Sequence, residues 1–129
     1  MIAVKFAITT DGSGDYTSSI TTAPQSDVMK DGMGPKLLYA VEWVDGTLAD
    51  GNDAVLSQTD TMSGVDKTLL TLTNANDDAW YYPRVLEDDN AGADVTAYAM
   101  QVVTGTLKLV VSSGGATATG ACWVYLLEV

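Results

Sequence analysis

TLKLVVSSGGATATGACWVYLLE, residues 106–128, holds two apolar segments on either side of a turn rich in glycine and threonine. In the first segment, apolar residues recur at every second position from Leu107 to Val111, which is the period of a strand with one buried face. The second segment is apolar on both faces, because Trp123 and Tyr125 alternate with further apolar residues. Such a strand is either central and covered twice within the chain, or covered on its outer side by another chain.

The N-terminal segment IAVKFAIT alternates strictly, with Ile2, Val4, Phe6 and Ile8 on one face and small or polar residues on the other. It predicts a half-buried strand. A tight turn, DGSG, follows, and its glycines are available for positive φ angles. The next segment, DYTSSITT, predicts a second strand that pairs with the first as a hairpin.

Four more segments predict strands, namely KLLYAVEWV, AVLSQT, KTLLTLTN and AWYYPRVL. In the first of these, every second residue from Leu37 to Trp43 shares one face, and Tyr39 belongs to that set. In the last, Pro83 cannot donate a ladder hydrogen bond, so the segment is an edge strand, a bulge or a strand end. Residues 93–103 are the one place where a helical turn could form, and their β-branched residues leave that choice open.

Together these segments predict one domain over residues 1–129, all-β, with little or no helix. About eight strands at these spacings predict an antiparallel β-sandwich, and the jelly roll is the more specific candidate. A chain of 129 residues is long enough to bury a core. No linker or internal repeat divides it.

The chain carries a net charge of −11, from 17 acidic and 6 basic side chains. Such a surface repels nucleic-acid backbones and anionic lipids, so neither nucleic acid nor a membrane is expected as a partner. No apolar run approaches the ~20 residues that span a bilayer as a helix, and the N-terminus lacks the pattern of a secretory signal. With a single cysteine, the expected site of folding is a reducing cytoplasm.

Residues typical of catalytic and metal sites are scarce. The absence of histidine excludes Ser-His-Asp and Cys-His mechanisms and removes the commonest transition-metal ligand. Cys122 lies among apolar neighbours, and as the single cysteine it can form neither an internal disulfide nor a cysteine zinc site. The turns DGSGD and DGTLADGND lack the ligand spacing of an EF-hand, although calcium at one of them stays open. We therefore predict a non-enzyme, with no cofactor and no metal site.

Arg84 is the only arginine, and it follows the aromatic residues Trp80, Tyr81 and Tyr82. A guanidinium beside aromatic rings can stack on a ring and pair with a carboxylate. We predict that Arg84 forms an ion pair that locks this strand into the fold or holds it against a neighbouring subunit. The alternative is an anion-binding site.

The aromatic residues have two interpretations, as core and interface anchors or as a platform on which a sugar stacks. We favour the first, and carbohydrate binding stays as the alternative. The candidate contact residues for a partner are Trp80, Tyr81, Tyr82, Arg84, Trp123, Tyr125, Met29 and Met33.

The order of these features resembles small virion proteins of tailed bacteriophages that are encoded near the major capsid gene. The resemblance is carried by the hairpin TTDGSGD, the apolar segment LLYAVEWVDG, the segment WYYPR and the C-terminal LKLVVSSGGATATGACWVYLLE. It covers most of the chain, and residues 25–35 and 59–66 match least. The chain differs from these proteins after Arg84. They often carry more charge of both signs there, whereas VLEDDNAGADVTAYAMQVV is acidic and partly apolar.

The resemblance implies a capsid decoration or cement protein on the virion surface, with the major capsid protein as its partner. It also implies self-association on the capsid, as a trimer or another oligomer. A protein that binds only the assembled lattice stabilises that lattice by mass action. The alternatives are a carbohydrate-binding β-sandwich displayed on a virion or tail, and a head-completion or tail subunit.

Overall fold

The computed structural model describes residues 1–21, 35–60 and 63–128. Within these ranges the chain forms eleven strands and no helix, so none of these segments could cross a bilayer as an apolar helix. The strands, in chain order, are β1 (Ile2–Thr9), β2 (Tyr16–Thr21), β3 (Lys36–Val44), β4 (Asp53–Asp60), β5 (Asp66–Leu72), β6 (Ala79–Tyr81), β7 (Val85–Asp88), β8 (Asp94–Ala99), β9 (Val102–Val103), β10 (Gly105–Ser112) and β11 (Thr119–Glu128).

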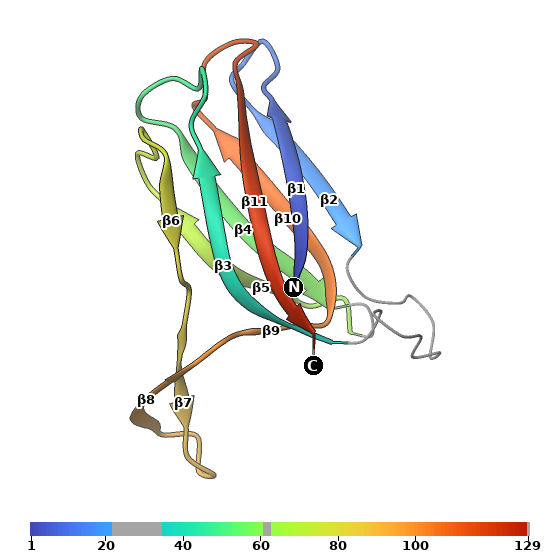
Figure 1. Ribbon diagram of the computed structural model, residues 1–129, viewed down its shortest axis with the longest axis vertical. Helices are drawn as coiled ribbons and strands as arrows, with labels where there is room; N and C mark the ends of the chain where they lie inside the picture. Colours follow the sequence, from blue (N-terminus) through green and yellow to red (C-terminus); the bar gives the residue numbers. More distant parts are fainter. Residues whose placement is uncertain (22–34, 61–62, 129) are drawn as a thin grey trace.

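Most of the strands form two layers that face each other across the core (Figure 1). Sheet A has the order β1-β11-β3-β6, and the short strand β9 joins it beside β3. Sheet B has the order β2-β10-β4-β5. All pairs within the two sheets are antiparallel. The predicted all-β antiparallel sandwich is therefore confirmed.

The strand pairs are nested along the chain. β1 pairs with β11, β2 with β10, β3 with β6 and β4 with β5, so the body is a long antiparallel ribbon folded over on itself. Pairing of β11 with β3, and of β10 with β4, completes the two sheets. This nesting is the strand order of a jelly roll, the more specific of the predicted arrangements.

The predicted hairpin between the first two strands is wrong. β1 pairs with β11 and β2 pairs with β10, so the DGSG turn leads from one sheet into the other. Alternation specifies which face of a strand is buried, and here Phe6 and Ile8 do face the core as predicted. It does not specify the neighbour with which a strand pairs, and the two C-terminal strands take that place beside β1 and β2.

The alternation predicted for β3 holds only in its second half. Val41 and Trp43 are fully buried as expected, but Leu38 is buried in place of Leu37. The cause is a β-bulge, because the register against β11 shifts and leaves Tyr39 as the extra residue on β3. A bulge reverses the alternation of faces along a strand, and the sequence pattern alone gave no signal of it.

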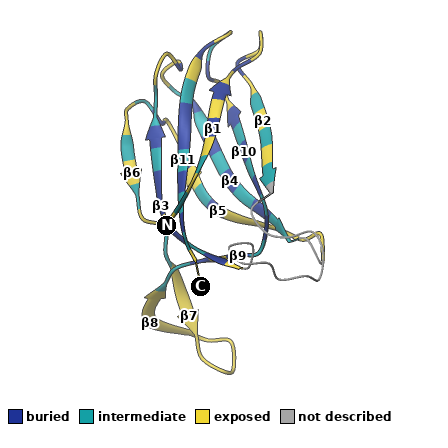
Figure 2. Ribbon diagram, turned by 45° about the vertical axis from the view of Figure 1, so that its right-hand side comes forward, coloured by how far each residue is buried: buried dark blue, intermediate teal, exposed yellow. Residues whose placement is uncertain are grey.

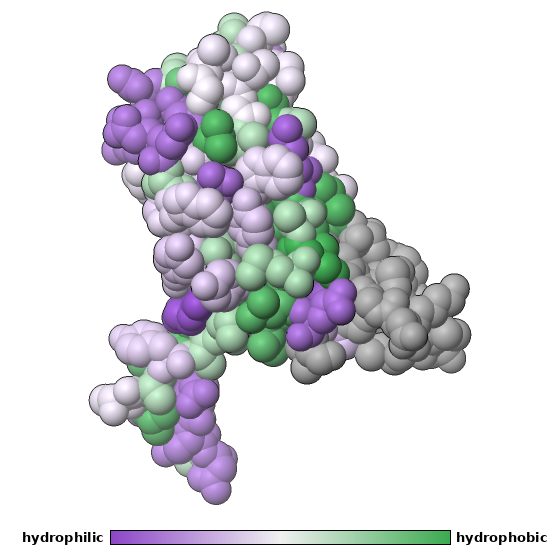
Figure 3. Space-filling view, viewed as in Figure 1, coloured by the Kyte–Doolittle hydropathy of each residue, from purple (hydrophilic) through white to green (hydrophobic). Residues whose placement is uncertain are grey.

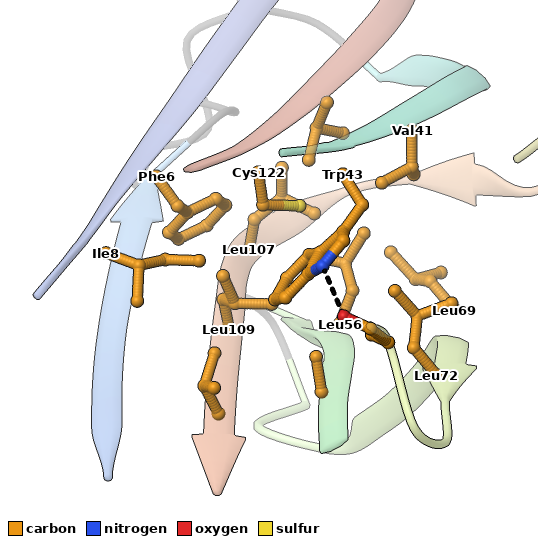
Figure 4. Packing of buried hydrophobic residues seen from close by; sticks show 14 of the residues in the cluster. Phe6, Ile8, Val41, Trp43, Leu56, Leu69, Leu72, Leu107, Leu109 and Cys122 are labelled. Atoms are coloured by element: carbon orange, nitrogen blue, oxygen red, sulfur yellow. Dashed lines mark hydrogen bonds between the residues drawn. The ribbon is translucent and has the colours of Figure 1, made fainter. Parts of the chain in front are cut away.

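The core lies between the sheets, where the strands carry their buried residues (Figure 2), and side chains from both layers pack against one another there (Figure 4). Trp43 lies in it without exposed surface, and its indole Nε1 donates a hydrogen bond to the carbonyl oxygen of Ala75 at 3.2 Å (Figure 4). Cys122 is buried beside it, and burial raises the pKa of this thiol to about 12. Cys122 is therefore a core side chain, and a buried, protonated thiol is a poor nucleophile.

The segment between β6 and β10 leaves the sandwich. β6 is the edge strand of sheet A and ends at Tyr81, two residues before Pro83, as the proline predicted. β7 and β8 then form a separate two-stranded hairpin that projects below the body (Figure 1). Residues 93–103, the one place where the sequence allowed a helical turn, instead hold β8 and β9.

Candidate functional site

The hairpin of β7 and β8, residues 85–99, is hereafter called the arm. In the described part of the chain its strands pair with each other and with no third strand. All of its strand residues except Ala99 are exposed, which Figure 2 shows as a yellow hairpin below a largely blue and teal body. The arm therefore adds nothing to the core of the sandwich.

The arm combines apolar side chains with negative charge. Its exposed apolar residues include Leu86 and Tyr98, which lie opposite each other across the two strands, and Tyr98 is 68% exposed. Val85 and Val95 are exposed as well. Between residues 85 and 99 the sequence has four carboxylates and no lysine or arginine. This mixture suits a contact with a basic, partly apolar surface.

The tip of the arm is closed by a well-defined loop. One carboxylate oxygen of Asp89 accepts hydrogen bonds from the backbone N–H groups of Ala91 (2.8 Å) and Ala93 (3.0 Å). Gly92 has a φ of 83°, a conformation that glycine adopts without strain. The acceptor role of the carboxylate lowers the pKa of Asp89. The loop shape is therefore encoded locally, by an aspartate and a glycine three residues apart.

Arg84 fixes the first leg of the arm, residues 82–84, which leads from β6 into β7. Its guanidinium Nη1 donates to the carbonyl oxygens of Tyr39 at 3.0 Å and Pro83 at 2.8 Å, and the guanidinium carbon lies 6.0 Å from the centre of the Tyr39 ring. Tyr39 is the bulged residue of β3, and its ring meets that of Tyr82 edge to face at 6.0 Å. Arg84 thus binds the first leg to β3 of sheet A.

No carboxylate partner of Arg84 occurs among the described residues. The predicted anchoring of the WYYPR strand to the fold is therefore present, but backbone carbonyls take the place of the intrachain ion pair. The second form of the prediction, an ion pair to a neighbouring subunit, stays a prediction.

Two buried glutamines fix the second leg of the arm, residues 100–104, which returns from β8 to β10. Gln58 donates from Nε2 to the carbonyl oxygen of Val102 and accepts from the backbone N–H of Thr104, both at 2.9 Å. Gln101 donates from its side-chain Nε2 to the carbonyl oxygen of Leu69 at 2.9 Å. The backbone carbonyl oxygen of Gln101 accepts a hydrogen bond from the N–H of Leu38 at 2.8 Å. The base of the arm is therefore held on both sides, while the arm itself extends into solvent.

The outer face of sheet A carries the second candidate surface. Four residues from the four strands lie side by side in one register row, in the order Lys5, Trp123, Glu42 and Trp80. The ammonium nitrogen of Lys5 lies 5.2 Å from the centre of the Trp123 ring, within range of a cation–π interaction. Trp80, at the other end of the row, is 52% exposed. We call these four residues the outer row.

Tyr125 links two members of the outer row. Its ring stacks against that of Trp80, with the ring centres 5.3 Å apart, and its hydroxyl donates a hydrogen bond to Oε1 of Glu42 at 3.2 Å. Desolvation, followed by the bond to Glu42, raises the pKa of the Tyr125 hydroxyl, so the hydroxyl stays protonated at neutral pH. The Glu42 carboxylate is thereby oriented between two tryptophans.

The outer face of sheet B is chemically different. Lys108, on β10, lies between Ser19 of β2 and Ser57 of β4. Tyr16 is the one aromatic residue in the four strands of this sheet, and it pairs with the core residue Val111 and not with the outer set. Within the described residues, exposed aromatic rings therefore lie on sheet A, at Tyr82 on the leg into the arm, and on the arm itself. Figure 3 shows the sheet A side, with the arm below the sheet and not across it.

The structure brings together some of the predicted contact residues and separates others. Trp80, Trp123 and Tyr125 lie on the outer face of sheet A, while Tyr82 and Arg84 lie at the base of the arm. Tyr81 instead points toward the core and packs against it. Met29 and Met33 fall outside the residues that the structure describes.

Sequence reasoning missed three elements of these surfaces. Lys5 and Glu42 were each visible as a polar residue on the outer side of a strand, but only the register places them in one row. The arm was missed although DNAGA at its tip repeats the spacing of the DGSGD turn, with an aspartate three residues before a glycine.

The aspartate-rich turns act through backbone contacts in this structure. Asp11 accepts from the N–H groups of Ser13 and Asp15, as Asp89 does at the tip of the arm. Among the described residues no group of three or more His, Cys, Asp or Glu side chains is arranged to hold a metal ion.

Comparison with protein-family models, with curated proteins and with solved structures finds no match to this chain. The two candidate surfaces are therefore interpreted from their own chemistry.

Proposed function

We propose that the chain is a non-enzymatic structural protein of a virion, of the capsid decoration kind, and that its arm docks on a subunit of the capsid lattice. The observation that carries this proposal is the arm itself. A two-stranded hairpin without a third strand or a supporting surface is only marginally stable in water. The arm has neither within the described chain, and it exposes Leu86 and Tyr98. A surface on a partner supplies the missing support.

The charge of the arm restricts the partner. Two arms would repel each other, since each carries four carboxylates without a cation between residues 85 and 99. A lattice subunit with a basic groove would complement these carboxylates and accept the apolar side chains between them. The net charge of −11 would also steer the whole protein toward such a surface.

Stabilisation would follow from mass action. If the arm binds only where assembled subunits form its groove, each bound copy favours the assembled state over free subunits. Many symmetric copies make the sum large even when each contact is modest. Anchoring of both legs of the arm limits the entropy that docking costs, because Arg84 and Gln101 already fix its base.

The test is the copy number of the chain in purified particles, measured by quantitative mass spectrometry against the major capsid protein. Decoration predicts hundreds of copies, at a simple ratio to the capsid subunit. A dozen copies or fewer would indicate a tail or head-completion subunit, and complete absence would remove the virion proposal. The role of the arm is tested by replacing residues 85–99 with a short glycine-serine linker, which should abolish binding to particles that lack the protein.

Carbohydrate binding is the second candidate, and the outer row favours it. Trp80 exposes a ring next to the Glu42 carboxylate, and such a pair can stack on a sugar and accept hydroxyl hydrogen bonds. A glycan array tests this candidate directly. Binding that is lost in Trp80→Ala but kept in the arm replacement would support it.

A further inference from the structure

We propose that the outer face of sheet A is a two-fold interface between two copies of this chain, in which Lys5 of each copy pairs with Glu42 of the other. The proposal uses the outer row and not the arm. It therefore stands or falls separately from the virion proposal.

The first argument is the polarity of the outer row. A cation, Lys5, lies at the β1 end, and a carboxylate, Glu42, lies two strands away on β3. Trp123 lies between them on β11. Adjacent strands are about 4.8 Å apart, so the two charged residues lie at similar distances on either side of Trp123.

The second argument is the symmetry that this spacing permits. A two-fold axis that runs parallel to β11, between two facing copies of sheet A, exchanges the β1 side with the β3 side and keeps each residue in its row. It places Lys5 of one copy over Glu42 of the other, twice, with the two Trp123 rings at the axis. Interfaces with this symmetry are self-complementary, and they are the commonest kind in homo-oligomers. A two-fold axis perpendicular to the strands would instead place Lys5 over Lys5.

The remaining charges agree with the same axis. The acidic corner formed by Asp45, Asp77 and Asp78 lies beyond the ends of β3 and β6. The proposed rotation places it opposite the β1 side of the other copy, where Ala7 and Thr9 are the outward residues. The two acidic corners therefore do not meet, although each chain carries a charge of −11.

The third argument is the contrast between the two outer faces. Interface centres are enriched in tryptophan and tyrosine, and fully solvated faces are not. The outer face of sheet A carries Trp80, which is 52% exposed and stacks on Tyr125, together with the half-buried Trp123 and Tyr125. Among the described residues, the outer face of sheet B carries serine and threonine, Lys108 and the half-exposed pair Val55 and Val110, and it has no aromatic ring. One of the two faces is thus built for contact.

The test is a charge exchange followed by light scattering after size-exclusion chromatography, over a series of protein concentrations. The unaltered chain should form a dimer of twice 13.5 kDa. Lys5→Glu and Glu42→Lys should each weaken the dimer about tenfold or more, because each places like charges together across the interface. The double variant, Lys5→Glu with Glu42→Lys, keeps the net charge and should restore the dimer.

Lys108→Glu is the matched control, since it makes the same change of charge on the outer face of sheet B. It should leave the dimer intact. Lys5 is exposed, so Lys5→Glu tests the proposal even if Glu42→Lys proves unstable, and circular dichroism checks the fold of each variant. A monomer at all concentrations, a double variant no better than the single ones, or equal loss in Lys108→Glu would each overturn the proposal. So would a dimer that is lost only with the arm, or glycan binding to this face by a monomer.

Discussion

A single loop motif occurs twice in the chain and sets the direction of the backbone at both places. Asp11 and Asp89 each accept hydrogen bonds from the N–H groups two and four residues later, and a glycine with positive φ stands at the third position after each. The first loop carries the chain from sheet A to sheet B, and the second closes the arm. In both, the side chain replaces ladder partners that the backbone cannot find in a turn.

The carboxylate of Asp11 should make the stability of the fold depend on pH. Its backbone hydrogen bonds lower the pKa of Asp11 below the ordinary 3.8. A lowered pKa in the folded state means that stability is gained above the unfolded value and lost as the pH falls through the folded value. We expect Asp11→Asn to lower the melting temperature at neutral pH and to differ less and less from the unaltered protein below about pH 4. Thermal denaturation followed by circular dichroism across pH 2–7 measures this.

Asp45→Asn serves as the control of opposite sign. Desolvation, opposed by the hydrogen bond from Asn52 and reinforced by the neighbouring aspartates, raises the pKa of Asp45. A raised pKa means that the stability contribution is present below the unfolded value and is lost as the pH rises through the folded value. Asp45→Asn should therefore raise the melting temperature at neutral pH. A shift of the same sign in both variants would contradict this account of the turns.

Arg84 joins the bulge of β3 to the first leg of the arm, and its removal should be felt in both. Arg84→Ala leaves the carbonyl oxygen of Tyr39 without the guanidinium donor, which should cost about 1–2 kcal/mol in the free energy of unfolding. Urea denaturation measures the change, and Lys108→Ala, which removes one positive charge from the outer face of sheet B, is the control. If both variants unfold at the same urea concentration, the contact to Tyr39 contributes nothing beyond charge.

At the scale of the element, the strands of the sandwich divide into inner and outer faces, with a bulge interrupting the alternation on β3. On β10, Leu107, Leu109 and Val111 are buried, and the residues between them are half-exposed. Each strand of the two sheets contributes mainly one of its two faces to the core, so neighbouring residues in these strands should differ sharply in their effect on stability.

β10 offers two adjacent residues for this test. Leu109→Ala removes a side chain with 1% exposed surface and should cost about 2–5 kcal/mol in the free energy of unfolding. Val110→Ala, one residue later on the outer face, should cost no more than about 1 kcal/mol. Urea denaturation of both variants gives the comparison. Similar costs at the two positions would mean that sheet B is covered on its outer side as well.

The same division explains how far the sequence predicts the fold. Alternation placed the inner faces of β1 and β10 correctly, because period two is a local property of a strand. It failed at Tyr39, where a bulge depends on the neighbouring strand β11, and it paired β1 with β2 because pairing is decided by the whole set of strands. The aromatic contact residues could be named from sequence, but the outer row could not, since Lys5 and Glu42 are 37 positions apart and meet only through register.

At the scale of the molecule, stability and contact are assigned to different parts. The jelly roll holds the buried side chains, and the arm holds none. The body should therefore fold without the arm, while the arm depends on its two anchored legs and on a partner. This separation leads to a prediction that does not require the partner to be known.

Hydrogen exchange of the free protein should divide the backbone amides into two classes. Amides in the ladders of β3, β10 and β11 open only with the fold as a whole, so they should exchange slowly. Amides of β7 and β8, which form a two-stranded ladder exposed to water, should exchange much faster. Replacing residues 85–99 with a linker should leave the slow class unchanged. Slow exchange in β7 and β8 of the isolated chain at low concentration would contradict this division, because it would mean that the arm is stable without the support of a partner.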